Sequence, residues 1–132
     1  MIEILQPPGW PRPRGYSNGI AASGRQVFVS GMIGWNAQGE FESDDFAFQA
    51  RQALMNVVAV LREAGAGPQH IVRMTWYVLD RRAYLAASIA LGAAYRDVIG
   101  AHYPAMTAVE VRALIEERAQ VEIEATAVVP NA

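Results

Sequence analysis

The sequence predicts an α+β fold in which two helices cover one face of a six-stranded mixed sheet. Two segments, residues 43–61 and residues 82–99, repeat apolar residues at helical spacing. The segments between and around them alternate apolar and polar residues with the period of a strand. A chain of 132 residues has the size of one domain, so we expect residues 1–132 to form a single domain.

The first third of the chain is predicted to consist of strands and extended loops. Residues 6–15 hold four prolines and two glycines, which excludes a helix there. The expected elements are strands at residues 2–5, 16–22 and 26–30, a turn at Ser23 and Gly24, and a loop at residues 32–42.

An amphipathic helix is expected to start at Ser43. Ser43 is a good N-cap residue, and Asp44 and Asp45 would lie favourably in the first turn against the helix dipole. Gly65 is a natural stop after the last turn. The apolar stripe of this helix consists of Ala47, Ala50, Leu54, Val57, Val58 and Leu61.

The second half of the chain is predicted to be strand, helix and hairpin. Residues 71–79 are rich in strand-forming Val, Thr, Trp and Tyr, and residues 82–99 are expected to form one helix that ends at Gly100. The tail, residues 103–127, alternates apolar and charged residues on both sides of a polar turn expected near Glu117.

An antiparallel hairpin in the tail would bring charged residues together. In that register Arg112 lies opposite Glu122, and Glu110 lies opposite Glu124. One sheet face would then carry three carboxylates and one guanidinium. The two helices can cover only one face of such a sheet, so we expect this charged face to be left uncovered by helices.

Composition excludes several classes of function. The formal net charge of −2 argues against a nucleic-acid partner, and no apolar run is long enough to span a membrane. The N-terminus lacks the basic head and apolar stretch of a secretory signal, so we expect a cytoplasmic protein. The chain has no Cys, and all eleven basic residues are Arg, which excludes thiolate chemistry and a lysine Schiff base.

Four segments, taken in order, resemble the signature segments of the RidA/YjgF/UK114 family. They are PRPRGYSNGI at residues 11–20, VFVSGMIGW at 27–35, YPAMTAVEV at 103–111 and VEIEATA at 121–127. Members of this family are small trimers, and many of them hydrolyse reactive enamines and imines. The resemblance implies a chorismate-mutase-like, YjgF-like fold, a barrel-like trimeric core with ligand clefts between subunits, and no cofactor.

The resemblance also assigns roles to three residues of the tail. Glu122 aligns with the active-site glutamate, which would manage the attacking water and the proton. Met106 stands where the deaminases of the family have an Arg that binds the substrate carboxylate, and Met offers an apolar surface instead. A structural salt bridge to Arg112 is the alternative to this catalytic role of Glu122, and Arg112 itself faces either the ligand cleft or the subunit contact.

Further substrate-binding residues follow from the other matched segments. The phenol of Tyr16 would flank the substrate, and backbone groups at Ser30, Gly31, Thr107 and Ala108 would orient it. Met32 replaces a Gln of the family pattern, and Trp35 could add an aromatic wall. We expect no metal site, because the two histidines lack a suitably spaced carboxylate partner.

The sequence therefore predicts a homotrimer that hydrolyses an enamine or imine, without a cofactor, to a carbonyl compound and ammonia. The substrate is expected to be larger or less acidic than the simple 2-imino acids. Two alternatives stay open: a non-catalytic ligand-binding or regulatory trimer, favoured by Met106, and an endoribonuclease, which the negative charge disfavours.

Overall fold

The computed structural model describes residues 2–131, and within this range the chain forms six strands and three α-helices. In chain order they are β1 (Ile2–Leu5), β2 (Gly19–Ala22), β3 (Arg25–Ile33), α1 (Phe46–Glu63), the 3-10 turn η1 (Pro68–His70), β4 (Ile71–Val78), α2 (Arg81–Ala86), α3 (Ser88–Val98), β5 (Ala105–Glu110) and β6 (Val121–Val129).

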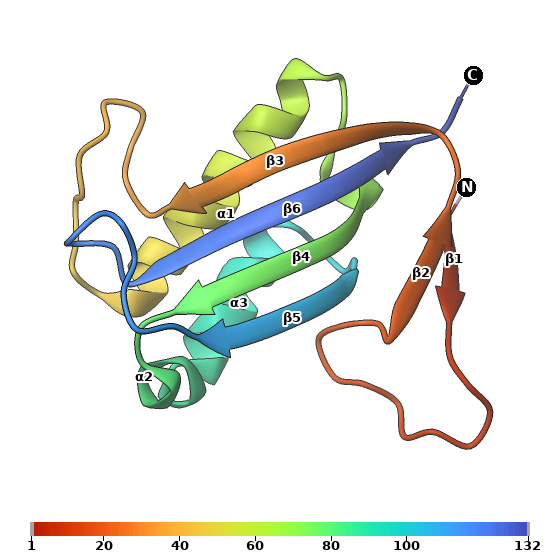
Figure 1. The fold of residues 1–132 in the computed structure, drawn as a ribbon, viewed down its shortest axis with the longest axis horizontal. Helices are drawn as coiled ribbons and strands as arrows, with labels where there is room; N and C mark the ends of the chain where they lie inside the picture. Colours follow the sequence, from red (N-terminus) through yellow and green to blue (C-terminus); the bar gives the residue numbers. More distant parts are fainter. Residues whose placement is uncertain (1, 132) are drawn as a thin grey trace.

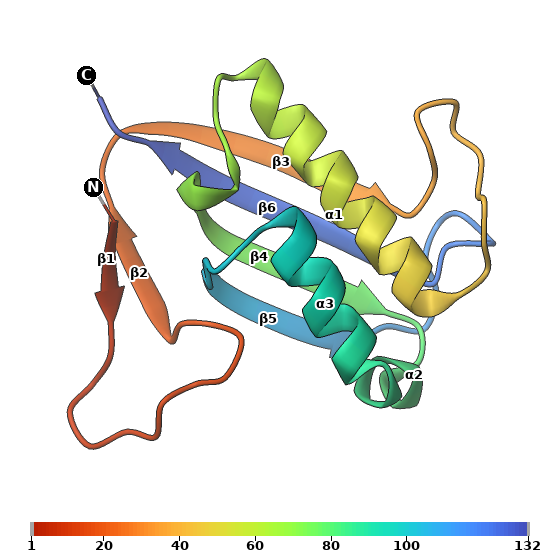
Figure 2. The same cartoon turned by 180° about the vertical axis from the view of Figure 1, so that it is seen from behind.

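The six strands form two sheets and not the single sheet that the sequence predicts. The main sheet has four strands in the order β3-β6-β4-β5, and β1 pairs with β2 in a separate two-stranded sheet beside one end of it (Figure 1). The main sheet is mixed, because β4 and β5 are parallel while β6 is antiparallel to both of its neighbours. The helices α1 and α3 lie on the same face of this sheet (Figure 2).

The hairpin predicted in the tail is wrong, and the two strands predicted on either side of Ser23 and Gly24 do not pair with each other either. β2 and β3 follow each other around the turn at Gly24 but pair with different strands. β5 pairs with β4, and the long connection at residues 111–120 lets β6 insert between β3 and β4. Alternation fixes which face a side chain occupies, but it does not choose the neighbouring strand.

The charged pairs expected in the tail are therefore not formed. The cross-strand partner of Glu122 is Tyr77, and the partner of Glu124 is Thr75. Arg112 is exposed beyond the end of β5. Glu110 is in register with Val78, whose side chain is in the core, and its Oε1 accepts a hydrogen bond of 2.8 Å from the backbone of Arg81.

The long helix α1 forms as predicted, with a different cap. Asp45 and not Ser43 is the N-cap, because its carboxylate accepts a hydrogen bond from the backbone of Phe48, while the Ser43 hydroxyl accepts one from the backbone of Asp45. Gly65 adopts a positive φ of 68°, which confirms it as the stop. Five of the six predicted stripe residues are buried; Ala47 packs at the edge of the core.

The second predicted helix is two helices, which join at Ala87. Local propensity does not explain this break, because alanine favours helix. Packing gives the reason. Tyr84 of α2 meets Phe46 and Trp76 edge-to-face, whereas Leu91 and Tyr95 of α3 are buried in the core on the side of α1. The helix ends before Gly100, as predicted, and Gly100 has a φ of 94°.

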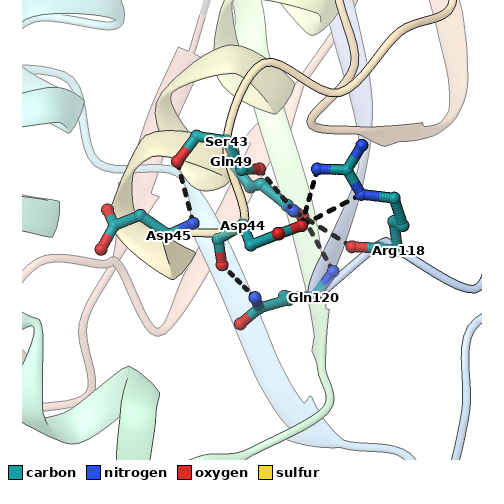
Figure 3. A network of polar contacts seen from close by, with 6 residues as sticks. All are labelled: Ser43, Asp44, Asp45, Gln49, Arg118 and Gln120. Carbon is teal, nitrogen blue, oxygen red and sulfur yellow. Dashed lines mark hydrogen bonds and ion pairs between the residues drawn. The ribbon is translucent and has the colours of Figure 1, made fainter.

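A fully buried glutamine fastens the connection before β6 to the start of α1 (Figure 3). Gln49 donates hydrogen bonds to the carbonyl oxygens of Ser43 (3.0 Å) and Arg118 (3.1 Å), and it accepts one from the backbone N–H of Gln120 (2.8 Å). The guanidinium of Arg118 also donates two hydrogen bonds to Asp44. This network positions the start of β6, and with it Glu122.

Candidate functional site

The face of the main sheet away from the helices carries polar side chains. On β4 and β6 alternate residues are buried under the helices, and the residues between them face outward. The outward-facing set on these two strands consists of Arg73, Thr75, Tyr77, Glu122, Glu124 and Thr126. The prediction that Glu122 and Glu124 share a face free of helices is confirmed, although Arg112 and Glu110 do not join them.

Glu122 and Gly31 are in direct contact on this face. β3 has an irregularity between Val29 and Met32, and Gly31 lies within it. A Cβ atom at position 31 would overlap the carboxylate of Glu122, so only glycine lets the two strands and this side chain lie as they do. Within the sequence segment that contains Ser30 and Gly31, the backbone of Gly31 thus lies directly against the Glu122 carboxylate.

A cavity of about 330 Å³ opens beside this contact. Its polar wall is formed by Tyr77, Glu122 and Glu124, and its apolar wall comes from the connection after β5, including Leu114 and the almost fully exposed Ile115. The volume falls within the range of roughly 300–1,000 Å³ that small-molecule sites occupy. The cavity is therefore large enough for a small metabolite.

The two carboxylates of the cavity have different environments. The hydroxyl of Tyr77 donates a hydrogen bond to Oε1 of Glu124, and this bond, followed by desolvation, raises the pKa of Tyr77. Among residues 2–131, no group forms a hydrogen bond or ion pair with the carboxylate of Glu122. Glu122 is therefore the carboxylate whose oxygens are free to accept a proton from water or from a ligand.

The remaining predicted residues lie outside this cavity. Met106 is in register with Met74 and packs against the core on the helix side. It lines a second cavity of about 370 Å³ between α3 and β5, whose walls include Trp76, Tyr84, Tyr95 and Tyr103. This cavity lies on the opposite side of the sheet from Glu122.

Tyr16 lines a third cavity, of about 710 Å³, with Arg12 and His102. Ser17 fixes the segment, because its hydroxyl donates to the carbonyl of Tyr103 (2.5 Å) and its backbone N–H donates to the carbonyl of Pro104 (3.0 Å). His102 is held by a contact of 2.6 Å between its Nε2 and the carbonyl of Ile71.

The other residues named from the sequence are scattered within one chain. Ser30 is exposed on β3, whereas Met32, predicted to be in a loop, belongs to β3 and packs on the core. The ring of Trp35 lies 5.9 Å from that of Phe41 in the loop before α1. Thr107 is in register with Thr75 on the outward face, and Ala108 is in register with Trp76.

Sequence reasoning missed Tyr77, which touches both the cavity and Glu124. The alternation of residues 71–79 was a usable signal, because Tyr77 has the parity of the strand's outward face. Within the described residues, no three His, Asp or Glu side chains are grouped as a metal site would require, and no helix is both long and apolar enough to span a membrane.

Comparisons with known proteins agree with the architecture. The family model described as Endoribonuclease L-PSP matches residues 11–129. A RutC family protein of Synechocystis is 34% identical, with 98% of each chain covered. The human 2-iminobutanoate/2-iminopropanoate deaminase is 29% identical over 97% of this chain and 88% of its own.

A solved structure extends the likeness to three dimensions. The Rid family protein YyfB of Yersinia pestis, described as a protein of unknown function, superimposes with a TM-score of 0.85 at 33% identity, with 97% of this chain and 98% of that chain covered. The match of the family model to most of the chain, together with this structural likeness, confirms the resemblance of the four sequence segments. The chain belongs to the RidA/YjgF family, with the α+β fold of that family.

Proposed function

We propose that the protein is an enamine/imine deaminase, which hydrolyses a reactive enamine or imine to a carbonyl compound and ammonia. One observation carries this proposal: Glu122 presents an unengaged carboxylate in a cavity, directly against Gly31, while its neighbour Glu124 is occupied by Tyr77. The activity in the name of the human relative supports the same class of reaction.

Hydrolysis of an imine requires a group that can carry a proton from oxygen to nitrogen in two successive steps. Glu122 takes a proton from a water molecule as the water oxygen bonds to the imine carbon. The protonated carboxyl then returns this proton to the nitrogen, which gives a carbinolamine. In a second transfer, Glu122 takes the proton of the carbinolamine hydroxyl and passes it to the nitrogen, so that the C–N bond breaks, ammonia leaves and the carbonyl forms. An enamine first becomes the imine by gaining a proton at carbon and losing one from nitrogen. The chain has no Lys or Cys to form a covalent intermediate, so water attacks the substrate directly.

We further propose that the working form is a homotrimer. Glu122, Met106 and Tyr16 of one chain line three separate cavities, so a neighbouring subunit would have to bring the missing walls to each. The sheet face away from the helices also carries Phe28, whose side chain is 71% exposed on β3. Both features support an assembly in which this face meets other copies of the chain.

The substrate is proposed to differ from the simplest 2-imino acids. Met106 cannot supply the planar, bidentate guanidinium that grips a carboxylate, and its side chain packs against an apolar core. Removal of such a charged hydrogen bond weakens binding by about 1.5–3 kcal/mol. An imine with a larger apolar body would regain that free energy by burial.

The test measures ammonia release from freshly generated imines that differ in size and in the presence of a carboxylate. We expect the wild type to act best on imines with bulky apolar groups and Glu122→Gln to lose the activity. Met106→Arg should shift the preference toward small carboxylate imines. If neither the wild type nor Met106→Arg hydrolyses any imine, the proposed activity is wrong.

A second candidate is a ligand-binding or regulatory trimer without catalysis. Met106 favours it, because the position that would grip a substrate carboxylate carries no charge. Saturable binding of a metabolite with no turnover would identify this function. The ribonuclease activity named in the family model is the least supported function, because a protein with a net charge of −2 lacks the positive charge that binds the phosphate backbone of RNA. Support for this activity would require that the wild type degrades RNA in the absence of metal and that the Glu122→Ala variant does not.

A further inference from the structure

One wall of the cavity beside Glu122 is aliphatic. Its residues all come from the connection after β5: Val111, Ala113, Leu114 and Ile115. The side chain of Leu114 is half-buried, and that of Ile115 is 97% exposed, so Ile115 contributes almost nothing to the core. Both side chains nevertheless border the same space as the Glu122 carboxylate, so a molecule bound at Glu122 would cover them.

This aliphatic wall is fastened at both ends but not in the middle. At its start, the backbone N–H of Val111 donates a hydrogen bond of 2.8 Å to the carbonyl of Val78. Beyond its other end, the guanidinium of Arg118 is held by Asp44. Within residues 2–131, no hydrogen bond joins residues 112–115 to another part of the chain. The middle of the wall can therefore adjust to a bound group, and substitutions there should leave the fold intact.

The lining of the cavity favours an uncharged alkyl group. Among the described residues that form it, none is an Arg or a His, so a negatively charged group would face Glu122 and Glu124 without a balancing cation. A positively charged group would pair with Glu122 and occupy the oxygens that the reaction needs. The only aromatic ring in this described lining is that of Tyr77, whose hydroxyl is engaged by Glu124. A branched alkyl group therefore matches the aliphatic wall best, because the contact excludes water from both surfaces.

We propose that Leu114 and Ile115 determine the specificity of the reaction, because they receive the side group of an imine whose reacting carbon lies at Glu122. The preferred substrate is then an imine with a branched, uncharged aliphatic side group. The inference rests on the proposed function, since it takes Glu122 as the group that moves the proton. It deepens that function by assigning recognition of the substrate's apolar body to two residues of the same cavity and the same chain as Glu122.

Binding can be measured without turnover by using primary amides, which have the planar shape of an imine. We expect 3-methylbutanamide to shift the ¹³C-methyl NMR signal of Ile115 saturably in the intact protein, with the signal assigned from Ile115→Val. Acetamide, which lacks the branched group, should bind about tenfold more weakly. Succinamate, whose side group ends in a carboxylate, should bind no better than acetamide. Absence of an Ile115 shift, or acetamide or succinamate binding as tightly as 3-methylbutanamide, would overturn the proposal.

Variants of the aliphatic wall test the two residues directly. Ile115→Ser and Leu114→Ala should each weaken the binding of 3-methylbutanamide about fivefold and leave that of acetamide unchanged, whereas Ile115→Leu should bind both amides as the wild type does. The matched control is Ile89→Ser, which replaces another highly exposed isoleucine (88%) on α3, outside the lining of this cavity. It should leave both affinities unchanged. Wild-type affinity for 3-methylbutanamide in Ile115→Ser and Leu114→Ala would overturn the assignment.

An exposed isoleucine can also serve in a contact between subunits, and light scattering separates the two roles. We expect Ile115→Ser to have the molar mass of the wild type in solution. A smaller assembly in this variant would assign Ile115 to the subunit contact and overturn its role in specificity.

Kinetics distinguish this proposal from the proposed activity. Ile115→Ser should raise KM for the imine of 3-methylbutanal and leave kcat/KM for the imine of acetaldehyde unchanged. If the wild type binds 3-methylbutanamide and yet hydrolyses none of the imines, the side-group site stands and the deaminase activity fails. If imines are hydrolysed at rates that do not depend on the side group, the activity stands and the side-group site fails.

Discussion

Tyr77 donates its hydroxyl hydrogen bond to Glu124, although its own cross-strand partner is Glu122. This diagonal contact gives different hydrogen-bonding environments to two glutamates that are otherwise alike, since both are half-buried on the same face of β6. Glu124 is engaged by a neutral donor, and Glu122 is left with free oxygens above Gly31. The two carboxylates should therefore have different roles, with Glu122 moving the proton and Glu124 holding Tyr77.

Glu122→Gln should lower imine hydrolysis by about 10²–10⁴-fold, because the amide keeps the shape but cannot accept a proton from water. Glu124→Gln should cost less than about tenfold, because an amide oxygen still accepts the hydrogen bond from Tyr77. The comparison requires kcat/KM of both variants on one imine, with ammonia as the readout. Equal losses in the two variants would contradict the division of roles.

Gly31→Ala should lower activity more than stability. The new methyl group would overlap the Glu122 carboxylate, so the side chain must move away or the strands must separate. Because the atoms in the way belong to the end of a flexible, half-buried side chain, this movement should cost no more than about 1 kcal/mol of unfolding free energy in urea unfolding, while kcat/KM falls with the displacement of Glu122. Gly92→Ala provides a contrast: its Cβ would have room in α3 and should stabilise the protein by about 0.5–1 kcal/mol. A wild-type kcat/KM for Gly31→Ala would argue against the contact.

Gln49→Leu should destabilise the protein by about 2–5 kcal/mol, although leucine has a similar size. The substitution leaves the N–H of Gln120 and the carbonyl oxygens of Ser43 and Arg118 unpaired in a buried region. Denaturant unfolding followed by circular dichroism would measure the loss. Gln69→Leu, at an exposed site in η1, should change stability by less than about 0.5 kcal/mol.

Stability should fall in alkaline solution, and Tyr95 should contribute to the fall. Burial, with the nearby Tyr103 adding to it, raises the pKa of Tyr95 far above its usual value. The unfolded chain releases this proton near a pKa of about 10 and the folded chain does not, so the stabilisation is complete below that pH and is lost as the pH rises toward the folded pKa.

Urea unfolding at several pH values between about 8 and about 11 would check this dependence. Tyr95→Phe should give a shallower loss above about pH 10, because phenylalanine does not titrate. The loss should not vanish in this variant, since burial also raises the pKa of Tyr84 and the hydrogen bond to Glu124 raises that of Tyr77. An identical slope in the wild type and Tyr95→Phe would contradict the contribution of Tyr95.

The faces of side chains could be predicted from the sequence, but the partners of strands could not. Alternation in residues 121–127 correctly placed Glu122 and Glu124 together. It could not show that Tyr77 lies beside them, because strand order is decided by how distant segments assemble. The same limit applies at the start of α1, where three successive residues are good caps and only the fold selects Asp45.

The cavities were beyond sequence reasoning for a related reason. The sequence shows that Met106 departs from a family motif, but it does not show the neighbours of Met106 in the second cavity. These neighbours come from the loop before β2, from β4 and from α2 and α3. The unpaired indole of Trp76 has no sequence signature, because a tryptophan in an apolar strand is normally expected to be an ordinary core residue. Only the packed structure shows that this buried donor lacks an acceptor among residues 2–131.

The position of β6 has a consequence for biosynthesis. This last strand lies in the middle of the main sheet, between β3 and β4, so the first hundred residues leave a gap where the sheet should be continuous. While residues 121–129 are still being translated, β3 and β4 lack the strand that lies between them, and native pairing must wait until these residues have left the ribosome. Nascent or prematurely terminated chains would expose two unpaired strand edges, which makes them natural clients of chaperones.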